Sequence, residues 1–204
     1  MRMNYVKRVK SEVETVGKYS KEFSSLLAER GISDIEAFIN PSLDDMCDPF
    51  SLDGISDAVN RINEAKNDSV LIYGDYDCDG ICATVILYKI LSGRVKAVNY
   101  FIPDRNVDGY GLSVNSLEKL LKKYSPDLVI TVDCGITSTD EVEFLKDRGV
   151  DVIVTDHHEP QNNLPDCIKI NPKIKREGFS DYCGAGVALK LAEALSSRED
   201  IKPL

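Results

Sequence analysis

The sequence predicts an α/β fold: an open, mainly parallel sheet of five strands with helices on both faces, preceded by a helical N-terminal segment. Up to residue 68, apolar residues recur at helical spacing. From residue 69 on, short apolar runs alternate with helical segments of about a dozen residues. This alternation is typical of βαβ units with parallel strands. We therefore expect a helical extension over residues 1–68 and an α/β domain over residues 69–204.

The N-terminal extension has three apolar stretches at helical spacing, at residues 23–27, 35–39 and 52–65. Gly31 separates the first two, and Pro41 ends the second. Each stretch is predicted to form a short helix.

In the α/β domain, the predicted strands are residues 70–73, 95–102, 128–132, 152–155 and 168–171. The predicted helices are residues 81–91, 113–124, 139–148 and 184–197. The helix at 81–91 is apolar nearly all round, so we expect it to be buried. Ser138 and Glu141 fit a capping box at the start of the helix at 139–148.

Composition excludes several classes of protein. Hydrophobic residues make up 43% of the 204 residues and charged residues 29%, which is typical of a globular chain. No apolar run approaches the roughly 18 residues that a membrane span needs, and no secretory signal precedes the domain. The six cysteines lack paired zinc-ligand spacing, as expected of reduced thiols. These features predict a cytoplasmic protein with no membrane partner.

The net charge is −9, from 25 basic and 34 acidic residues, which argues against a general nucleic-acid binder. Acidic residues concentrate between positions 41 and 80, a segment that contains ten Asp and Glu but only two basic residues. Such a site can still serve a polyanionic substrate if divalent cations invert its local charge.

Three aspartates, Asp75, Asp77 and Asp79, alternate directly after the first predicted strand. Alternate residues of an extended segment project to the same side, so their carboxylates would crowd together unless a cation lay between them. A solvated acidic turn is one alternative. A calcium loop is another, but its twelfth position would hold Ile86 instead of glutamate.

Further metal-ligating residue types follow the third and fourth predicted strands. These are Asp133, whose alternative role is a helix N-cap, and Asp156 with His157 and His158, the only histidines of the chain. Carboxyl ends of parallel strands share one edge of a sheet, so these residues are expected to meet Asp75–Asp79 there. Mixed carboxylate and imidazole ligands favour manganese or magnesium, and two ions sharing Asp133 could support an in-line phosphoryl displacement.

These segments resemble the first three motifs of the DHH phosphoesterase superfamily, and among its members the RecJ single-strand-specific exonucleases. The motifs are Asp75-Tyr76-Asp77-Cys78-Asp79-Gly80, Val132-Asp133-Cys134-Gly135 and Asp156-His157-His158. Supporting stretches include Ile102-Pro103-Asp104-Arg105, Asp108-Gly109-Tyr110-Gly111-Leu112 and Cys183-Gly184-Ala185-Gly186. The resemblance covers roughly residues 22–195 and implies the α/β fold already predicted.

The resemblance also implies two Mn²⁺ or Mg²⁺ ions. Asp77 would bind one ion, Asp79 and His157 the other, and Asp133 both. Asp75 would lie beside them as a further ligand or a neighbour of the ligands.

For the substrate, the resemblance implies that His158 faces the scissile phosphate while Asp156 orients the histidine pair. Arg105 and Tyr110 would contact the nucleic acid. The amides of Gly184, Ala185 and Gly186, which open a helix, would bind a phosphate; a tight turn is the alternative.

The implied activity is metal-dependent hydrolysis of single-stranded DNA from its 5′ end by an activated water. Its context is DNA repair and recombination, with other repair or replication proteins as partners. The alternatives are a phosphodiesterase for short oligonucleotides or cyclic dinucleotides, and a catalytically inactive nucleic-acid-binding scaffold.

Two departures from the family pattern stand out. Tyr73 occupies a position that is histidine in many superfamily members. The family's fourth motif, an aspartate, and its second domain are not found before Leu204, so we expect the chain to be the catalytic part of a longer enzyme; a shortened relative is the alternative.

Overall fold

The computed structural model describes residues 18–109, 111–175 and 179–201. It divides into two compact units, residues 1–46 and 47–204. The first unit contains the helices α1 (Lys21–Ala28) and α2 (Ile35–Ile39) and the 3-10 helix η1 (Leu43–Asp45). Ser20 and Asp34 cap α1 and α2 through their side chains.

The second unit carries the sheet and all of the predicted site residues that the structure describes. Its strands are β1 (Ser69–Tyr73), β2 (Ala97–Phe101), β3 (Leu128–Val132), β4 (Asp151–Thr155) and β5 (Ile168–Ile170). Its α-helices are α3 (Ile55–Glu64), α4 (Cys78–Leu91), α5 (Val114–Tyr124), α6 (Thr139–Lys146), α7 (Gly184–Leu195) and α8 (Arg198–Ile201). The 3-10 helices η2 (Pro49–Ser51) and η3 (Ala65–Asn67) flank α3.

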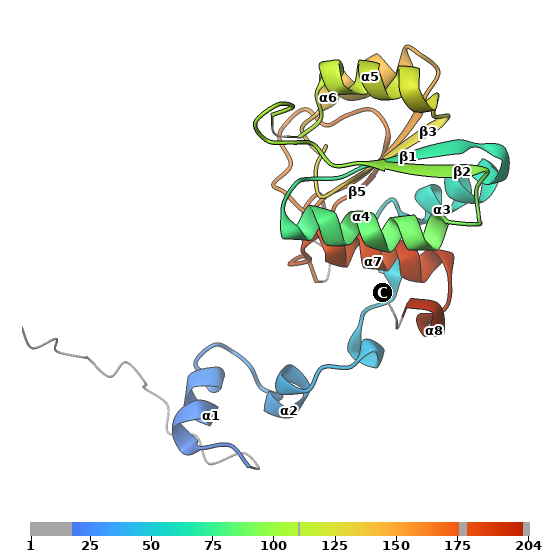
Figure 1. Cartoon of the computed structure of the whole chain (residues 1–204). Helices are drawn as coiled ribbons and strands as arrows, with labels where there is room; N and C mark the ends of the chain where they lie inside the picture. Colours follow the sequence, from blue (N-terminus) through green and yellow to red (C-terminus); the bar gives the residue numbers. More distant parts are fainter. Residues whose placement is uncertain (1–17, 110, 176–178, 202–204) are drawn as a thin grey trace, which may run out of the picture. The chain divides into compact units, whose positions relative to one another are not determined.

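The five strands form one parallel sheet in the order β2-β1-β3-β4-β5. Helices α3, α4 and α7 cover one face, and α5 and α6 cover the other (Figure 1). The predicted α/β fold with helices on both faces is therefore confirmed, and each predicted strand agrees with the observed one to within two residues.

The boundary between the units differs from the division predicted at residue 68. Helix α3 turns Ile55, Ala58 and Ile62 into the core between the sheet and α7. Its apolar face is thus buried with the α/β domain, which begins structurally at about Cys47.

Two local predictions are wrong. Helix α4 is not buried on all sides, because Ile81, Val85 and Tyr88 are 42%, 45% and 38% exposed. This face of α4 lies by the edge strand β2, where the ring of Tyr88 contacts that of Tyr100 (5.6 Å between ring centres) and remains partly exposed. The capping box at Ser138 is also absent: the Ser138 amide donates to the carbonyl of Gly135 (3.0 Å), which leaves Glu141 no such role. Among the described helices, none is long and apolar enough to span a bilayer.

Candidate metal centre

The candidate site lies at the switch point of the sheet, where the strand order continues from one side of β1 to the other. From β1 the chain goes to one side, to β2, and later returns to β3 on the other side of β1. Helix α4 follows β1 on one face, and α6 follows β3 on the opposite face. Parallel sheets bind ligands at the carboxyl ends of the strands beside such a switch point. Asp75 and Asp133 follow these two strands, and Asp156 follows β4.

The β1–α4 loop contributes two of its three aspartates to a common group. Asp75 is buried, and its side chain accepts the Tyr76 amide (2.8 Å). Asp77 is the N-cap of α4 and accepts the Gly80 amide through Oδ1 (3.0 Å). Carboxylate oxygens of Asp75, Asp77 and Asp133 lie within 4.8 Å of one another.

Asp79 lies beside this group, and its carboxylate is held by the first amides of α7. Helix α4 starts at Cys78, so Asp79 occupies its first turn and not an alternate position of an extended loop. Its carboxylate accepts the amides of Gly184 and Ala185, both at 2.7 Å. Burial opposes ionisation of Asp79, but hydrogen bonds from Ala185 and Gly184 outweigh it and lower the pKa. The expected crowding of all three carboxylates on one side is therefore wrong.

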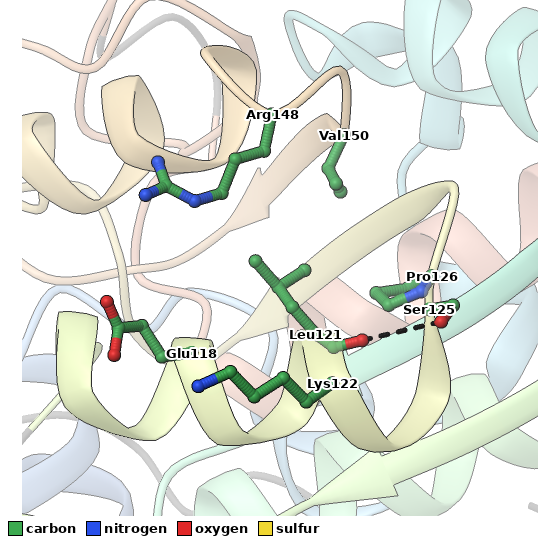
Figure 2. A pocket seen from close by; sticks show the side chains of 7 residues that line it. All are labelled: Glu118, Leu121, Lys122, Ser125, Pro126, Arg148 and Val150. Atoms are coloured by element: carbon green, nitrogen blue, oxygen red, sulfur yellow. Dashed lines mark hydrogen bonds between the residues drawn. The ribbon is translucent and has the colours of Figure 1, made fainter.

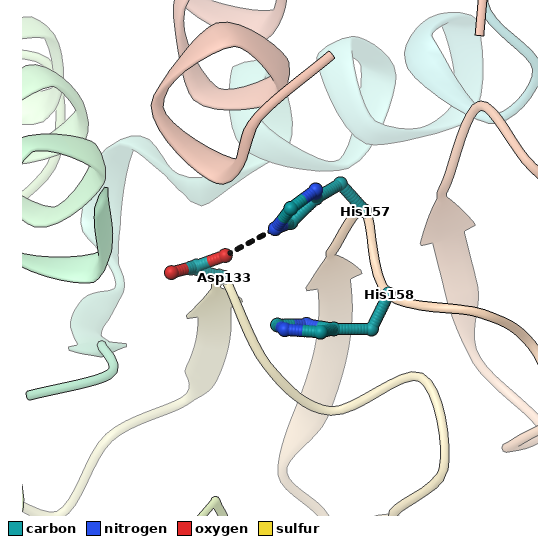
Figure 3. A group of neighbouring side chains, drawn as sticks. All are labelled: Asp133, His157 and His158. Carbon is teal, nitrogen blue, oxygen red and sulfur yellow. Dashed lines mark ion pairs between the residues drawn. The ribbon is translucent and has the colours of Figure 1, made fainter. Parts of the chain in front are cut away.

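Asp133 is the most constrained residue of the site. It has a left-handed backbone (φ 61°), and its side chain is 1% exposed. Oδ1 accepts no hydrogen bond; Nε2 of His157 lies 3.1 Å away, outside hydrogen-bond geometry (Figure 3). Burial, followed by the charges of Asp79 and Asp77, raises the pKa of Asp133 to about 7. A Cβ at position 184 would lie 2.6 Å from the Asp133 Cβ, so only glycine fits there.

Asp156 makes hydrogen bonds to both residues of the histidine pair. One oxygen accepts the amides of His157 (2.7 Å) and His158 (3.0 Å) and lies 2.7 Å from His158 Nδ1. The other oxygen accepts the Ile136 amide (2.9 Å). Although burial opposes it, these hydrogen bonds lower the pKa of Asp156.

Because Asp156 is ionised, Nδ1 of His158 carries a proton and Nε2 is the nitrogen that can bind a metal ion or exchange a proton. The hydrogen bond to Asp156 raises the pKa of His158. Both imidazole rings are directed at Asp133 (Figure 3), and one ligand atom from each of the three residues lies within 4.8 Å of the others. His157 Nε2 is also 3.6 Å from Asp79.

The predicted nucleic-acid contacts are only partly described. Arg105 lies with its guanidinium 5.5 Å from the ring centre of Tyr76, the residue between Asp75 and Asp77 in the β1–α4 loop. Tyr110 lies outside the described residues. At the start of α7, the amides of Gly184 and Ala185 hold Asp79, and the Gly186 amide donates to Cys183 Sγ (3.3 Å). The structure thus directs these amides at the protein itself, and phosphate binding there stays a prediction.

The sequence did not reveal that α7 meets the site. Gly184 presses against Asp133, and the α7 amides bind Asp79 across 105 residues of sequence. The sequence predicted a tight turn or a phosphate-binding turn at Gly184 and Gly186. That the amides there bind Asp79 depends on how α4 and α7 pack. The Ile136 amide, which holds Asp156, carried no sequence signal at all.

A cavity of about 510 Å³ lies elsewhere, between the ends of α5 and α6 (Figure 2). It is lined by Glu118, Lys122 and Arg148 together with apolar side chains. Ser125 and Val150 place it at the amino ends of β3 and β4, where no group of metal-ligating side chains was found among the described residues. The chemistry therefore concentrates at the opposite edge of the sheet.

The residues present fit a divalent metal ion. Asp133 has a buried oxygen without a hydrogen bond, and its pKa is raised first by burial and then by the charges of neighbouring carboxylates. A cation would offset both effects. Carboxylate and imidazole ligands suit Mn²⁺, and the carboxylates alone suit Mg²⁺.

Residues 69–203 match the DHH family, N-terminal domain. The chain belongs to the DHH family. Among DHH relatives, the single-stranded-DNA-specific exonuclease RecJ of Bacillus subtilis is 38% identical over 84% of this chain and 23% of its own length. RecJ of Thermus thermophilus is 37% identical over 74% of this chain and 23% of its own length. The resemblance stated from the motifs is confirmed.

Solved structures agree with this assignment. A structure of exonuclease RecJ bound to manganese matches with a TM-score of 0.67 and 37% identity, over 74% of this chain and 40% of that one. RecJ of Thermus thermophilus in complex with Mn²⁺ matches with a TM-score of 0.69 and 32% identity, over 88% and 26%. This DHH chain spans about a quarter of the length of the curated relatives named above.

Proposed function

We propose that this DHH chain hydrolyses phosphodiester bonds of single-stranded DNA from the 5′ end, using Mn²⁺ or Mg²⁺. The observation that carries the proposal is the convergence of Asp75, Asp77, Asp133, His157 and His158 at the switch point of the sheet. The RecJ relatives are named as exonucleases for this substrate, and solved RecJ structures hold manganese or magnesium.

Five side chains would hold the ions. Asp77, Asp133 and Asp75 offer oxygens on one side of the centre, and His157 lies on the other side of Asp133, near Asp79. For Asp79 to become a ligand, its carboxylate would have to share an oxygen with the α7 amides. Two bound ions supply an acidified water and neutralise charge on the phosphoryl oxygens.

His158 would act as a proton or hydrogen-bond donor to the substrate phosphate. Asp156 fixes the ring through Nδ1 and favours the protonated form of His158. Nε2 can then donate a hydrogen bond, or transfer its proton, to a phosphate oxygen. This division, with His157 on the metal and His158 on the phosphate, follows from their different neighbours. His157 faces the carboxylates Asp133 and Asp79, whereas His158 is held by Asp156.

Arg105 would contact a substrate phosphate, because its guanidinium suits bidentate binding of an anion. Tyr110 would contact the nucleic acid, and the Gly184–Gly186 turn would approach a phosphate. With a net charge of −9 the chain has little long-range attraction for DNA, so binding is expected to weaken steeply with salt.

The test is digestion of a 5′-labelled oligonucleotide with Mn²⁺ at low ionic strength, comparing the wild-type chain with Asp133→Asn. We expect slow release of labelled nucleotides, loss of activity in the variant, and little digestion at moderate salt. No digestion by the wild type, or equal digestion by the variant, would contradict the proposal. Faster cleavage of a dinucleotide than of a longer strand would favour the phosphodiesterase for short substrates, and DNA binding without cleavage would favour the scaffold.

We further propose that the chain works in the cytoplasm in DNA repair and recombination, together with repair or replication proteins. The RecJ names of its relatives support the substrate. All six cysteines are free thiols, which suits a reducing compartment.

A further inference from the structure

The loop between β2 and α5 carries Arg105 and is held together by its own hydrogen bonds. The amide of Asp104 donates to the carboxylate of Asp108 (3.0 Å), and the Asp108 amide donates back to the Asp104 carbonyl (2.7 Å). Asp108 in turn accepts the hydroxyl of Ser116 in α5 (2.9 Å). The loop is therefore a compact unit whose placement depends on what ties it to the sheet.

One such tie comes from the last residue of β1. Tyr73 is fully buried, and its hydroxyl donates to the carbonyl of Gly111 (3.0 Å) at the end of this loop. Its ring packs against Phe101, with 5.2 Å between ring centres, where β2 leads into the loop.

Tyr73 also stands next to the metal centre in sequence. Only Gly74 separates it from Asp75, so the strand end that places the carboxylates also holds the Gly111 carbonyl. Arg105 lies over the ring of Tyr76. The loop thus touches the β1–α4 segment twice, through the buried Tyr73 and through Tyr76.

We propose that Tyr73 is a positioning residue: its buried hydroxyl anchors the β2–α5 connection at Gly111, so that Arg105 stands at a fixed distance from Asp75 and Asp77. The proposal rests on the proposed function, since Arg105 matters only if a phosphate is bound there. Because Tyr73 is fully buried and its hydroxyl is bonded to Gly111, it would contact neither ion nor substrate. It links the segment that holds the metal to the loop that holds the substrate.

The test uses Tyr73→Phe, which keeps the ring and removes only the hydroxyl, and compares it with Tyr100→Phe, an exposed tyrosine on β2. Hydrogen exchange of the loop amides, such as those of Asn106 and Asp108, is expected to be about tenfold faster in Tyr73→Phe and unchanged in Tyr100→Phe. Exchange in β3 and β4, and Mn²⁺ affinity by calorimetry, should not change. Unchanged loop exchange, or equally faster exchange throughout the domain, would overturn the anchoring role.

A second measurement asks whether Tyr73 acts through Arg105. Anisotropy of a fluorescent single-stranded oligonucleotide gives the affinities of the wild type, Tyr73→Phe, Arg105→Ala and the double variant. We expect Arg105→Ala to cost less affinity in the Tyr73→Phe background than in the wild type. Independent losses that multiply would refute the link. A wild-type chain that binds no oligonucleotide would refute the proposed function, while the exchange data would still decide the anchoring.

Discussion

Replacing Asp133 by asparagine is expected to stabilise the metal-free chain while abolishing its response to Mn²⁺. The carboxylate is 1% exposed, has an oxygen without a hydrogen bond, and lies among Asp75, Asp77 and Asp79. Without a cation, an ionised Asp133 is therefore a cost to folding. Asparagine has nearly the same shape and no charge, so it removes that cost together with the ligand.

The magnitude follows from the pKa of Asp133, which burial and then the neighbouring carboxylates raise from 3.8 to about 7. Between these values the folded chain keeps a proton that the unfolded chain has lost, so stability falls as the pH rises from about 4 to about 7. At about 1.4 kcal/mol per unit, the cost reaches up to about 4 kcal/mol above pH 7 but only about 1.5 kcal/mol at pH 5. The gain from Asp133→Asn is thus expected to be about 2.5 kcal/mol larger at pH 8 than at pH 5.

Urea unfolding followed by circular dichroism, with a chelator present, measures this difference directly. Asp147→Asn is the matched control, because Asp147 is exposed at the end of α6 and is expected to change stability by a few tenths of a kcal/mol at either pH. Mn²⁺ should then raise the midpoint of the wild type and leave that of Asp133→Asn unchanged. If the variant is less stable than the wild type at pH 8, or responds equally to Mn²⁺, the electrostatic argument fails.

Three further changes probe the site. Gly184→Ala, whose methyl group would collide with Asp133, is expected to lower Mn²⁺ affinity at least tenfold by calorimetry, whereas Gly186→Ala, with no atom nearer than 3.4 Å, should change it little. His157→Ala is expected to weaken Mn²⁺ binding and His158→Ala to lower turnover with binding nearly intact; equal loss of metal affinity would contradict this division. Asp79→Ala removes two hydrogen bonds from a carboxylate and should reduce the free energy of unfolding by about 2 kcal/mol in urea, an effect that a merely solvated Asp79 would not show.

The sequence predicts the sheet well because each strand is a short apolar run that continues into a loop of different composition. The same pattern placed Asp75, Asp133 and Asp156 at one edge, since parallel strands share their carboxyl ends. Local periodicity is enough for both conclusions, because neither depends on which helix packs against which.

Predictions that depended on packing were less successful. The pattern of α4 is apolar all round, but its position beside the edge strand β2 leaves Tyr88 and Val85 exposed. The orientation of Asp79 depends on where α4 starts and on the nearby amides of α7, neither of which is visible in the motif itself. Serine followed by glutamate three residues later also predicted a capping box at Ser138. In the structure the Ser138 amide donates to the carbonyl of Gly135 instead of to Glu141.

The hydrogen bond between Gly184 and Asp79 has a consequence for the order of folding. It joins residues 105 positions apart, so it is a contact of long sequence separation, and it can form only once α7 has docked against the start of α4. A nascent or refolding chain can pair β1 with β3 before α7 docks. Asp75, Asp77 and Asp133 could then lie together while Asp79 has no hydrogen bond from α7. High-affinity ion capture is then expected to coincide with the slowest refolding phase, which makes the metal a kinetic reporter on the final helix.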